Sequence, residues 1–332
     1  MALNLGPDTT RIVGYEEYKP YIECKDNFIY VPDNKVNKRL KIEVDIDRKS
    51  SLYQMSKKFK EMRAPYKALK TREAKSKSNA LKIMVNTFYG ANTNPYINYG
   101  DMGVGIAITS VARYLLVQAI TLIRSKYGQR SVVYCHTDGI NTNIDVDVLW
   151  LTKRLRLILE NEIPFADTQW IDMDKDTFKE GYWVQIGNYV LRNEDGTLTK
   201  HGSTFKASTR SKFYGKNLDR IIEGRLANKI NQGFIDSLYD FEEVRLEDFL
   251  QRRSLNRPLE DYVSQTDMMI GLTEQGKGIG IEPLVGTTYQ YYRTKGSYTL
   301  KELVKDKSEL DVRYYWDIIS NQLRKFGLDE WV

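Results

Sequence analysis

The chain has 332 residues, 41% of them hydrophobic, with 50 basic and 44 acidic side chains and a formal net charge of +6. This composition predicts a folded protein of about two domains and excludes a disordered or collagen-like chain. Two cysteines and two histidines are too few for a disulfide framework or a typical zinc site, and we expect neither a membrane span nor a secretory signal, which favours a reducing, cytoplasmic compartment.

The positive charge is concentrated in two segments. Residues 48–82 carry a net charge of +10 and residues 200–229 one of +6, so the rest of the chain is acidic. Focused positive charge suggests a polyanionic partner, because phosphate neutralisation dominates non-specific nucleic-acid affinity. The alternative is that each cluster is an ordinary solvated helix face.

In chain order, the first 90 residues contain two kinds of pattern. Residues 28–31 and 41–46 are strand-like, and the second stretch alternates apolar side chains. Helical periodicity starts at Ser51, and Pro65 predicts the end of that helix or a turn. With a second helix from about Tyr66 to Tyr89, the two basic helices predict an antiparallel hairpin.

The remaining patterns predict a mixed α+β chain. A long apolar helix is expected over 106–128, a strand–turn–strand over 131–145 with Asp138-Gly139 as the turn, and a helix over 146–160. Strands are expected near 182–191, followed by a hairpin turn at 193–196. From about residue 207 the pattern is mostly helical, with weaker strands near 287–293.

One face of the second hairpin helix combines three polar groups. At about 100° per residue, Lys82, Asn86 and Tyr89 lie on one stripe. The apolar side chains of that helix end lie on a separate face: Leu81, Met84, Val85 and Phe88. An ammonium, an amide and a phenol ring suit a nucleoside triphosphate, and Gly90 would allow close approach of a backbone or base. An amphipathic surface helix whose Tyr89 covers the core would give the same pattern.

The segment from Lys82 to Gly90, KIMVNTFYG, resembles the KxxxNSxYG motif of family B DNA polymerases, with Thr87 in place of the serine. The resemblance implies an α+β right-hand polymerase fold with an antiparallel palm sheet, a helical fingers hairpin and a mostly helical thumb. It implies that Lys82 is catalytic and holds the triphosphate of the incoming nucleotide, while Asn86, Tyr89 and Gly90 complete the nucleotide-binding site. The implied parts are a palm lead-in at 1–47, fingers at 48–90, palm at 91–206 and thumb at 207–332.

The segment from Tyr134 to Gly139, YCHTDG, resembles the family's YGDTDS turn, which carries metal-binding aspartates. The resemblance implies that Asp138 is the catalytic metal ligand for two Mg²⁺ ions and that Tyr134 contacts DNA. His136 replaces the first aspartate, and imidazole is a poor Mg²⁺ ligand, so this departure bears on activity. From the residues alone, His136 can also be a turn-capping or core-edge histidine, and Asp138 a simple turn residue.

Further DNA contacts are expected from the same resemblance. Tyr189 lies where the family has its KKxY motif, and Lys206, Arg210 and Lys212 would contact the duplex backbone without reading sequence. The family's DxxSLYPS motif, which carries another aspartate, has no match, and residues 1–10 resemble the stretch that follows it.

The resemblance therefore implies the C-terminal subunit of a split DNA polymerase. Its N-terminal partner would carry the other catalytic aspartate and the 3′–5′ exonuclease, and the complex would act on primer-template DNA and dNTPs at a nucleoid or viral replication site. One alternative is a catalytically inactive polymerase relative that binds DNA or serves as a scaffold. Another is a nucleic-acid-binding module without enzymatic ancestry.

Overall fold

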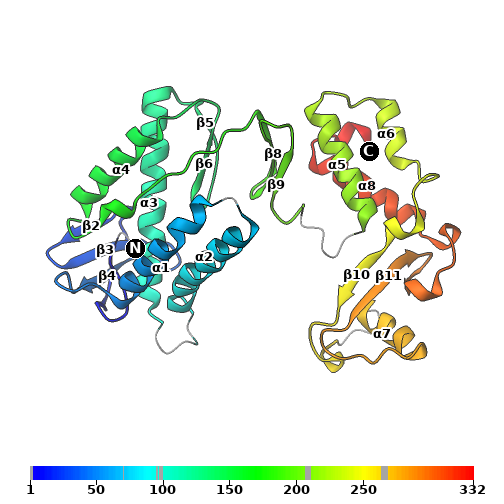
Figure 1. Ribbon diagram of the computed structural model, residues 1–332, viewed down its shortest axis with the longest axis horizontal. Helices are drawn as coiled ribbons and strands as arrows, with labels where there is room; N and C mark the ends of the chain where they lie inside the picture. Colours follow the sequence, from blue (N-terminus) through cyan, green and yellow to red (C-terminus); the bar gives the residue numbers. More distant parts are fainter. Residues whose placement is uncertain (1–2, 70, 95, 97–99, 206–210, 263–267) are drawn as a thin grey trace. The chain divides into compact units, whose positions relative to one another are not determined.

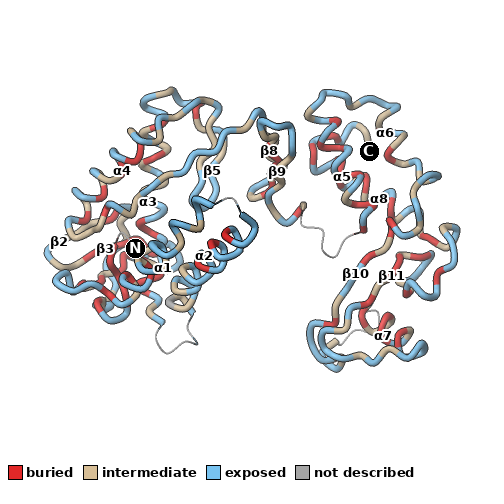
Figure 2. Tube along the Cα trace, in the orientation of Figure 1, coloured by how far each residue is buried: buried red, intermediate tan, exposed pale blue. Residues whose placement is uncertain are grey.

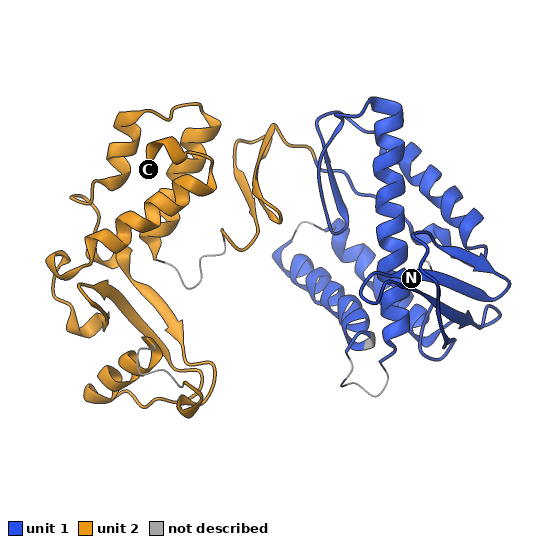
Figure 3. Ribbon diagram, turned by 180° about the vertical axis from the view of Figure 1, so that it is seen from behind, with its two compact units in different colours: residues 1–176 blue, residues 177–332 orange. Residues whose placement is uncertain are grey.

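The computed structural model describes residues 3–69, 71–94, 96, 100–205, 211–262 and 268–332. The chain forms two compact units, residues 1–176 and 177–332 (Figure 3). Helices and antiparallel sheets occur in both (Figure 1), so the predicted α+β class is confirmed.

The first unit begins with a four-stranded antiparallel sheet. Its strands β1 (Thr10–Glu16), β2 (Glu23–Lys25), β3 (Phe28–Asp33) and β4 (Lys38–Val44) lie in the order β1-β4-β3-β2. The strands predicted near 28–31 and 41–46 are thus confirmed. Apolar side chains of β3 and β4, including Ile29 and Ile42, are fully buried, because this face of the sheet packs on helix α3 (Met102–Tyr127).

Two helices, α1 (Ser51–Ala68) and α2 (Arg72–Asn92), form the predicted hairpin (Figure 1). The prediction that Pro65 ends the first helix is wrong, because α1 continues for three more residues. Pro65 has no N–H to donate to the carbonyl four residues earlier, yet the helix continues to Ala68. The backbone becomes extended at Leu69, and the second helix starts at Arg72 rather than near Tyr66.

The two hairpin helices are held together by side chains along their length. The rings of Phe59 and Phe88 lie 5.6 Å apart between centroids. Arg63 Nε donates a hydrogen bond to Ser78 Oγ at 3.2 Å, and Ser78 is buried. These contacts make α1 and α2 one packed element.

Helix α3 is the long apolar helix that the sequence predicts. By length and composition it could cross a membrane, which corrects the expectation that no stretch of the chain could. One such helix is weak evidence for a span. The buried residues of α3 join two cores: Val104, Ala107 and Val111 belong to the core under the sheet, and Ala119 and Ile123 pack with helix α4 (Val148–Glu162).

Between α3 and α4 lies a two-stranded hairpin, β5 (Val132–His136) and β6 (Gly139–Thr142). His136 pairs with Gly139, so the turn residues are Thr137 and Asp138. The predicted Asp138-Gly139 turn is therefore shifted by one residue. After α4, a 3₁₀ turn, η1 (Thr168–Trp170), leads towards the second unit.

The second unit opens with a three-stranded sheet, β7 (Glu180–Gln185), β8 (Asn188–Arg192) and β9 (Leu198–His201), with the predicted turn at 193–196. One face of this sheet joins the unit's largest core, formed with α5 (Lys212–Leu226), α6 (Gln232–Tyr239) and α8 (Val312–Lys325). Figure 2 shows the buried positions concentrated along α5 and α8.

A second, smaller core in this unit lies around the sheet β10 (Gln251–Ser254), β11 (Thr288–Thr294) and β12 (Ser297–Leu300), which packs on α7 (Met268–Gly278). The predicted strand near 287–293 is confirmed as β11. The remaining elements are the 3₁₀ turns η2 (Leu246–Phe249), η3 (Leu259–Asp261), η4 (Lys301–Leu303), η5 (Lys307–Glu309) and η6 (Asp329–Trp331).

Candidate functional site

The polar stripe of α2 is exposed along its length. Lys82 and Asn86 are exposed, and Tyr89 is 39% exposed. Among the described residues Lys82 has no ion pair or hydrogen bond, so its ammonium is available to an anion. The prediction that Met84 lies on the apolar face is wrong, because its side chain is 43% exposed. The face that packs against the protein consists instead of Ala74, Ser78, Leu81, Val85 and Phe88.

A cavity of about 380 Å³ lies beside this stripe, within the first unit. Asn86 and Tyr89 line it together with side chains from the N-terminal segment, α1 and α3. Its lining is mostly apolar, with a few polar groups: Leu3, Asn4, Leu5, Leu52, Tyr53, Ser56, Val85, Asn86, Phe88, Tyr89 and Ile108. A small number of polar groups in a mostly apolar concavity is typical of small-molecule sites. A Cβ at Gly90 would meet no atom within 4 Å, so the chain leaves space there.

The N-terminal wall of this cavity is fixed to the start of α1. Buried Asn4 donates to Arg48 O at 3.0 Å and accepts from Ser50 N at 3.1 Å. Asp8 accepts from Ser51 N at 2.9 Å. Burial opposes ionisation of Asp8, but the Ser51 hydrogen bonds outweigh it and lower the pKa of that carboxyl. These hydrogen bonds therefore hold the N-terminal wall of the cavity against the start of α1.

The basic cluster of the hairpin is only partly neutralised. Arg48, Lys67 and Lys77 form ion pairs with Asp8, Asp174 and Glu73 respectively. Among the described residues, eight further cations of this cluster have no ion pair: Lys49, Lys57, Lys58, Lys60, Arg63, Arg72, Lys75 and Lys82. The hairpin therefore keeps a positive surface that suits phosphate groups.

Asp138 lies exposed at the tip of the β5–β6 hairpin. Its neighbour Thr137 has a φ of 57°, a left-handed conformation that is rare for a β-branched residue and occurs preferentially at functional sites. Thr137 Oγ1 lies 3.1 Å from His136 Nδ1, and the rings of Tyr134 and His136 are nearly parallel, 6.3 Å apart. The turn thus presents the Asp138 carboxylate to solvent.

The donor set at this turn does not by itself fit two Mg²⁺ ions, which need several oxygen ligands. In the described part of the chain, no group of three or more Asp, Glu, His or Cys side chains could hold a metal ion. No hydrogen bond or ion pair joins Asp138 to Lys82, Asn86 or Tyr89 among the described residues. A metal site at this turn would therefore need ligands besides Asp138.

Tyr189, in the second unit, is the middle member of an aromatic row. It pairs across the sheet with Trp183 on β7 and with His201 on β9. The ring centroids lie 6.5 Å from Trp183 and 4.6 Å from His201, the latter pair being stacked. A Cβ at Gly181 would lie 2.7 Å from the Trp183 ring, so glycine lets this ring lie close over the sheet. We call Trp183, Tyr189 and His201 the aromatic row.

The predicted backbone-contacting cations are only partly described. Lys212 is exposed at the first turn of α5. Lys206 and Arg210 lie outside the described residues. Lys212 and Tyr189 belong to the second unit, whereas Asp138 and the α2 stripe belong to the first.

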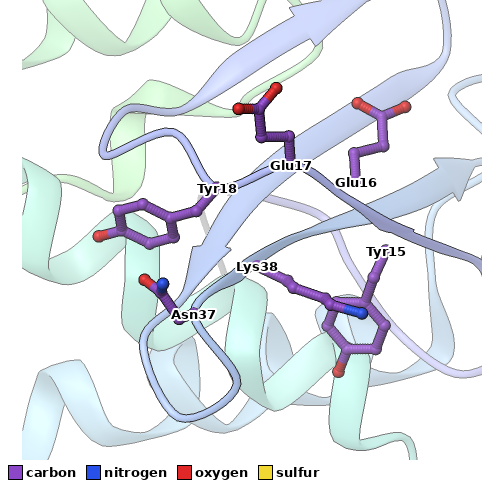
Figure 4. Close-up of a pocket in the computed structure, with 6 residues that line it drawn as sticks. All are labelled: Tyr15, Glu16, Glu17, Tyr18, Asn37 and Lys38. Atoms are coloured by element: carbon purple, nitrogen blue, oxygen red, sulfur yellow. The ribbon is translucent and has the colours of Figure 1, made fainter.

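The first unit has another cavity that sequence reasoning missed (Figure 4). It measures about 520 Å³ and is lined by side chains at the end of β1 and the turn before β4: Tyr15, Glu16, Glu17, Tyr18, Asn37 and Lys38. Glu16 is paired with buried Arg39 at 3.1 Å. The predicted site residues do not line this cavity.

Comparison with known proteins gives a consistent result, although no family model matches the chain. The chain is 23% identical over 345 residues to a DNA polymerase of Thermococcus sp. (strain 9oN-7) and 24% identical over 357 residues to a DNA polymerase of Thermococcus gorgonarius. These alignments cover 96% and 98% of this chain. They cover 41% and 43% of the relatives, so the chain spans about two fifths of the length of the curated relatives it matches.

Among solved structures, the fold resembles the family B DNA polymerase from Pyrobaculum calidifontis, with a TM-score of 0.60 and 19% identity. That match covers 98% of this chain and 42% of the polymerase. The chain is thus similar in sequence to archaeal DNA polymerases and in fold to a family B DNA polymerase, in agreement with the resemblance of the Lys82–Gly90 segment.

Proposed function

We propose that this chain supplies the nucleotide-binding part of a DNA-directed DNA polymerase that uses dNTPs and primer-template DNA. The observation that carries the proposal is the exposed stripe of Lys82, Asn86 and Tyr89, of which Lys82 is unpaired and the other two line a cavity. The relatives in sequence are DNA polymerases, which supports the same reaction class. In the proposed division of the chain, residues 1–47 lead into the palm, 48–90 are fingers, 91–206 palm and 207–332 thumb.

The α2 residues would act by binding and orientation. Lys82 would hold the triphosphate through charge-assisted hydrogen bonds, which are stronger than neutral ones. Asn86 and Tyr89, one turn further along the same face, would orient the base and sugar against the cavity wall. Orientation of this kind lowers the barrier of a template-directed transfer without covalent participation of the protein.

Asp138 would be the metal ligand that this chain contributes. When bound, two Mg²⁺ ions activate the primer 3′-hydroxyl and stabilise the leaving pyrophosphate. The exposed turn holds the Asp138 carboxylate away from competing side chains, since Asp138 has no hydrogen bond or ion pair within the described residues. No group of three or more metal-binding side chains lies among the described residues, so we propose that a second carboxylate is supplied from elsewhere.

That further carboxylate is the reason to propose an N-terminal partner subunit, which would also carry the 3′–5′ exonuclease. The hairpin β5–β6 is a two-stranded sheet in the described part of the chain, and isolated hairpins are marginally stable. A strand from the partner, added at the edge of this hairpin, would complete both the sheet and the metal site. The assembled heterodimer would act at a nucleoid or viral replication site in the cytoplasm.

DNA would be bound by both units. Tyr134 lies next to the metal-binding turn, and Tyr189 belongs to the aromatic row, whose rings offer surfaces to bases or sugars. Lys206, Arg210 and Lys212 would contact phosphates, which fix position without reading sequence.

The test is primer extension by the purified chain, alone and together with the partner that co-purifies from the native source. We expect no extension by the chain alone and template-dependent extension by the complex. Robust extension by the isolated chain would contradict an active site shared between two chains. A partner that lacks a strand with a catalytic carboxylate would contradict the proposed role of the partner.

A second candidate function is a catalytically inactive relative that binds DNA or serves as a scaffold. His136 favours it, because a family aspartate is replaced there by a residue that binds Mg²⁺ poorly. This candidate predicts DNA binding by the complex with no nucleotide incorporation under any divalent metal. Incorporation by the wild-type complex would exclude it.

A further inference from the structure

Three contacts join one face of α1 to the segment that follows α4. Tyr53, Lys60 and Lys67 are seven residues apart and so lie on nearly the same face of the helix. Tyr53 Oη donates to Asp167 Oδ2 at 2.5 Å, and Lys60 Nζ lies 4.6 Å from the centre of the Trp170 ring. Lys67 Nζ lies 2.8 Å from Asp174 Oδ2.

The segment that receives α1 is itself fixed to α4 over residues 168–171. Arg156 donates from Nε and Nη2 to Ile171 O at 3.0 and 2.8 Å. Thr168 Oγ1 donates to Glu160 Oε1 at 2.6 Å, and Thr168 is buried. Trp170 therefore has a rigid support, whereas Asp174 lies beyond the last of these anchors.

The three contacts differ strongly in their exposure to water. Tyr53 is 5% exposed, and Trp170 Nε1 donates to both Tyr53 Oη and Asp167 Oδ2. Burial opposes ionisation of Asp167, but these hydrogen bonds outweigh it and lower its pKa. At the other end, the side chains of Lys67 and Asp174 are 58% and 77% exposed, and such ion pairs are individually weak.

Movement of α1 would carry the nucleotide stripe with it. Phe59 packs on Phe88, and Arg63 bonds Ser78, so α1 and α2 move as one element. The 14 residues from Tyr53 to Lys67 span about 21 Å of helix, at about 1.5 Å per residue. A change at one end of α1 is thus a change in the position of Lys82.

We propose that Tyr53, Asp167 and Trp170 form a pivot for the hairpin, that Lys67 and Asp174 form a latch, and that pivot and latch together position the α2 stripe for nucleotide binding. The proposal rests on the proposed function of that stripe. Lys67, Asp167, Trp170 and Asp174 are positioning residues, since they act through α1 and α2 and line neither the stripe nor the cavity beside it, whereas Tyr53 also lines that cavity. The latch is an exposed ion pair, whereas the pivot is half-buried, with Tyr53 itself buried.

The first experiment measures the position of α1 directly, by pulsed electron–electron distance measurement. Spin labels are placed at Met62→Cys on α1 and Asn161→Cys on α4, with Cys24→Ser and Cys135→Ser. We expect one narrow distance distribution in the parent chain and a broader one with Lys67→Gln. Lys67→Asp alone should broaden it, and adding Asp174→Lys should restore the narrow distribution. Lys58→Gln, an equal loss of charge at an exposed and unpaired position of α1, should change nothing.

The second experiment measures dATP affinity by equilibrium titration of the full chain. Because the latch is an exposed ion pair, Lys67→Gln and Asp174→Asn should each weaken dATP binding about two- to fivefold. Tyr53→Phe keeps the ring but removes a buried hydrogen bond to a carboxylate, and should weaken it about tenfold. Duplex DNA affinity should stay unchanged for the Asp174 and Tyr53 variants, which a general loss of structure would not allow.

These outcomes distinguish failure of the pivot and latch from failure of the proposed nucleotide-binding function. Unchanged distances and unchanged dATP affinity in Lys67→Gln, or failure of the exchanged pair to restore the parent distribution, would overturn the latch. If the parent chain bound no dATP at all, the proposed function of the stripe would fail, while the distance measurements would still decide whether the pivot and latch exist.

Discussion

Replacing Lys82 by alanine separates nucleotide binding from folding. Lys82 is exposed and unpaired among the described residues, so its removal should change the free energy of unfolding by less than about 0.5 kcal/mol. If its ammonium binds the triphosphate, the lost charge-assisted hydrogen bonds are worth about 1.5–3 kcal/mol. At about 1.4 kcal/mol per factor of ten, dNTP affinity should fall about ten- to 150-fold.

The assay is dATP titration of the full chain, with urea unfolding as the measure of stability. Lys75→Ala is the matched control, because Lys75 is also exposed and unpaired and lies on the same stripe, about 10 Å nearer the helix start. We expect less than a twofold change for Lys75→Ala. Equal losses for the two variants would show that only general positive charge matters, and would refute a specific role for Lys82.

Three further predictions concern the surrounding structure. Ser50 Oγ accepts from Tyr53 N at 3.0 Å as the N-cap of α1, so Ser50→Ala should lower stability by about 1 kcal/mol in urea unfolding, and an unchanged midpoint would contradict the cap. Tyr189→Ala should weaken single-stranded DNA binding by about 1–3 kcal/mol in fluorescence anisotropy if bases stack on the aromatic row, and this loss should persist at high salt, whereas a change confined to low-salt conditions would argue against stacking. The Asp167 carboxyl has a lowered pKa in the folded chain, so its stabilising contribution is present above about pH 4 and is lost as the pH falls through the folded value. Asp167→Asn should remove this part of the acid dependence of unfolding, and an identical acid profile would refute it.

Local sequence patterns predicted the helices and strands that are determined by residues close together in the chain. The 3.6-residue period placed Lys82, Asn86 and Tyr89 on one exposed stripe, because packing of α2 on α1 uses the opposite face. The same reasoning misplaced Met84 at the margin of that face, and it treated Pro65 as a helix end although the helix continues to Ala68.

The positioning contacts could not be predicted in this way. Tyr53 and Asp167 are 114 residues apart, and the segment around Asp167 has neither helical nor strand periodicity. The turn at Asp138 was misplaced by one residue. A turn dipeptide indicates that a turn is present but not which residues pair across it, and in the structure the pairing of His136 with Gly139 sets that register. The cavity next to Tyr89 depends on Leu3 and Ile108, which lie far from it in the chain.

The most direct test of the central claim is primer extension by the complex of this chain and its partner, with Asp138→Asn in place of the wild-type chain. Asp138 is exposed and unpaired among the described residues, so the substitution should leave folding and complex formation intact. Asp47→Asn, another exposed carboxyl of the first unit, is the control and should retain full activity. We predict that Asp138→Asn abolishes measurable extension while DNA binding persists. Near-normal extension by that variant would contradict the assignment of Asp138, and with it the polymerase site proposed for this chain.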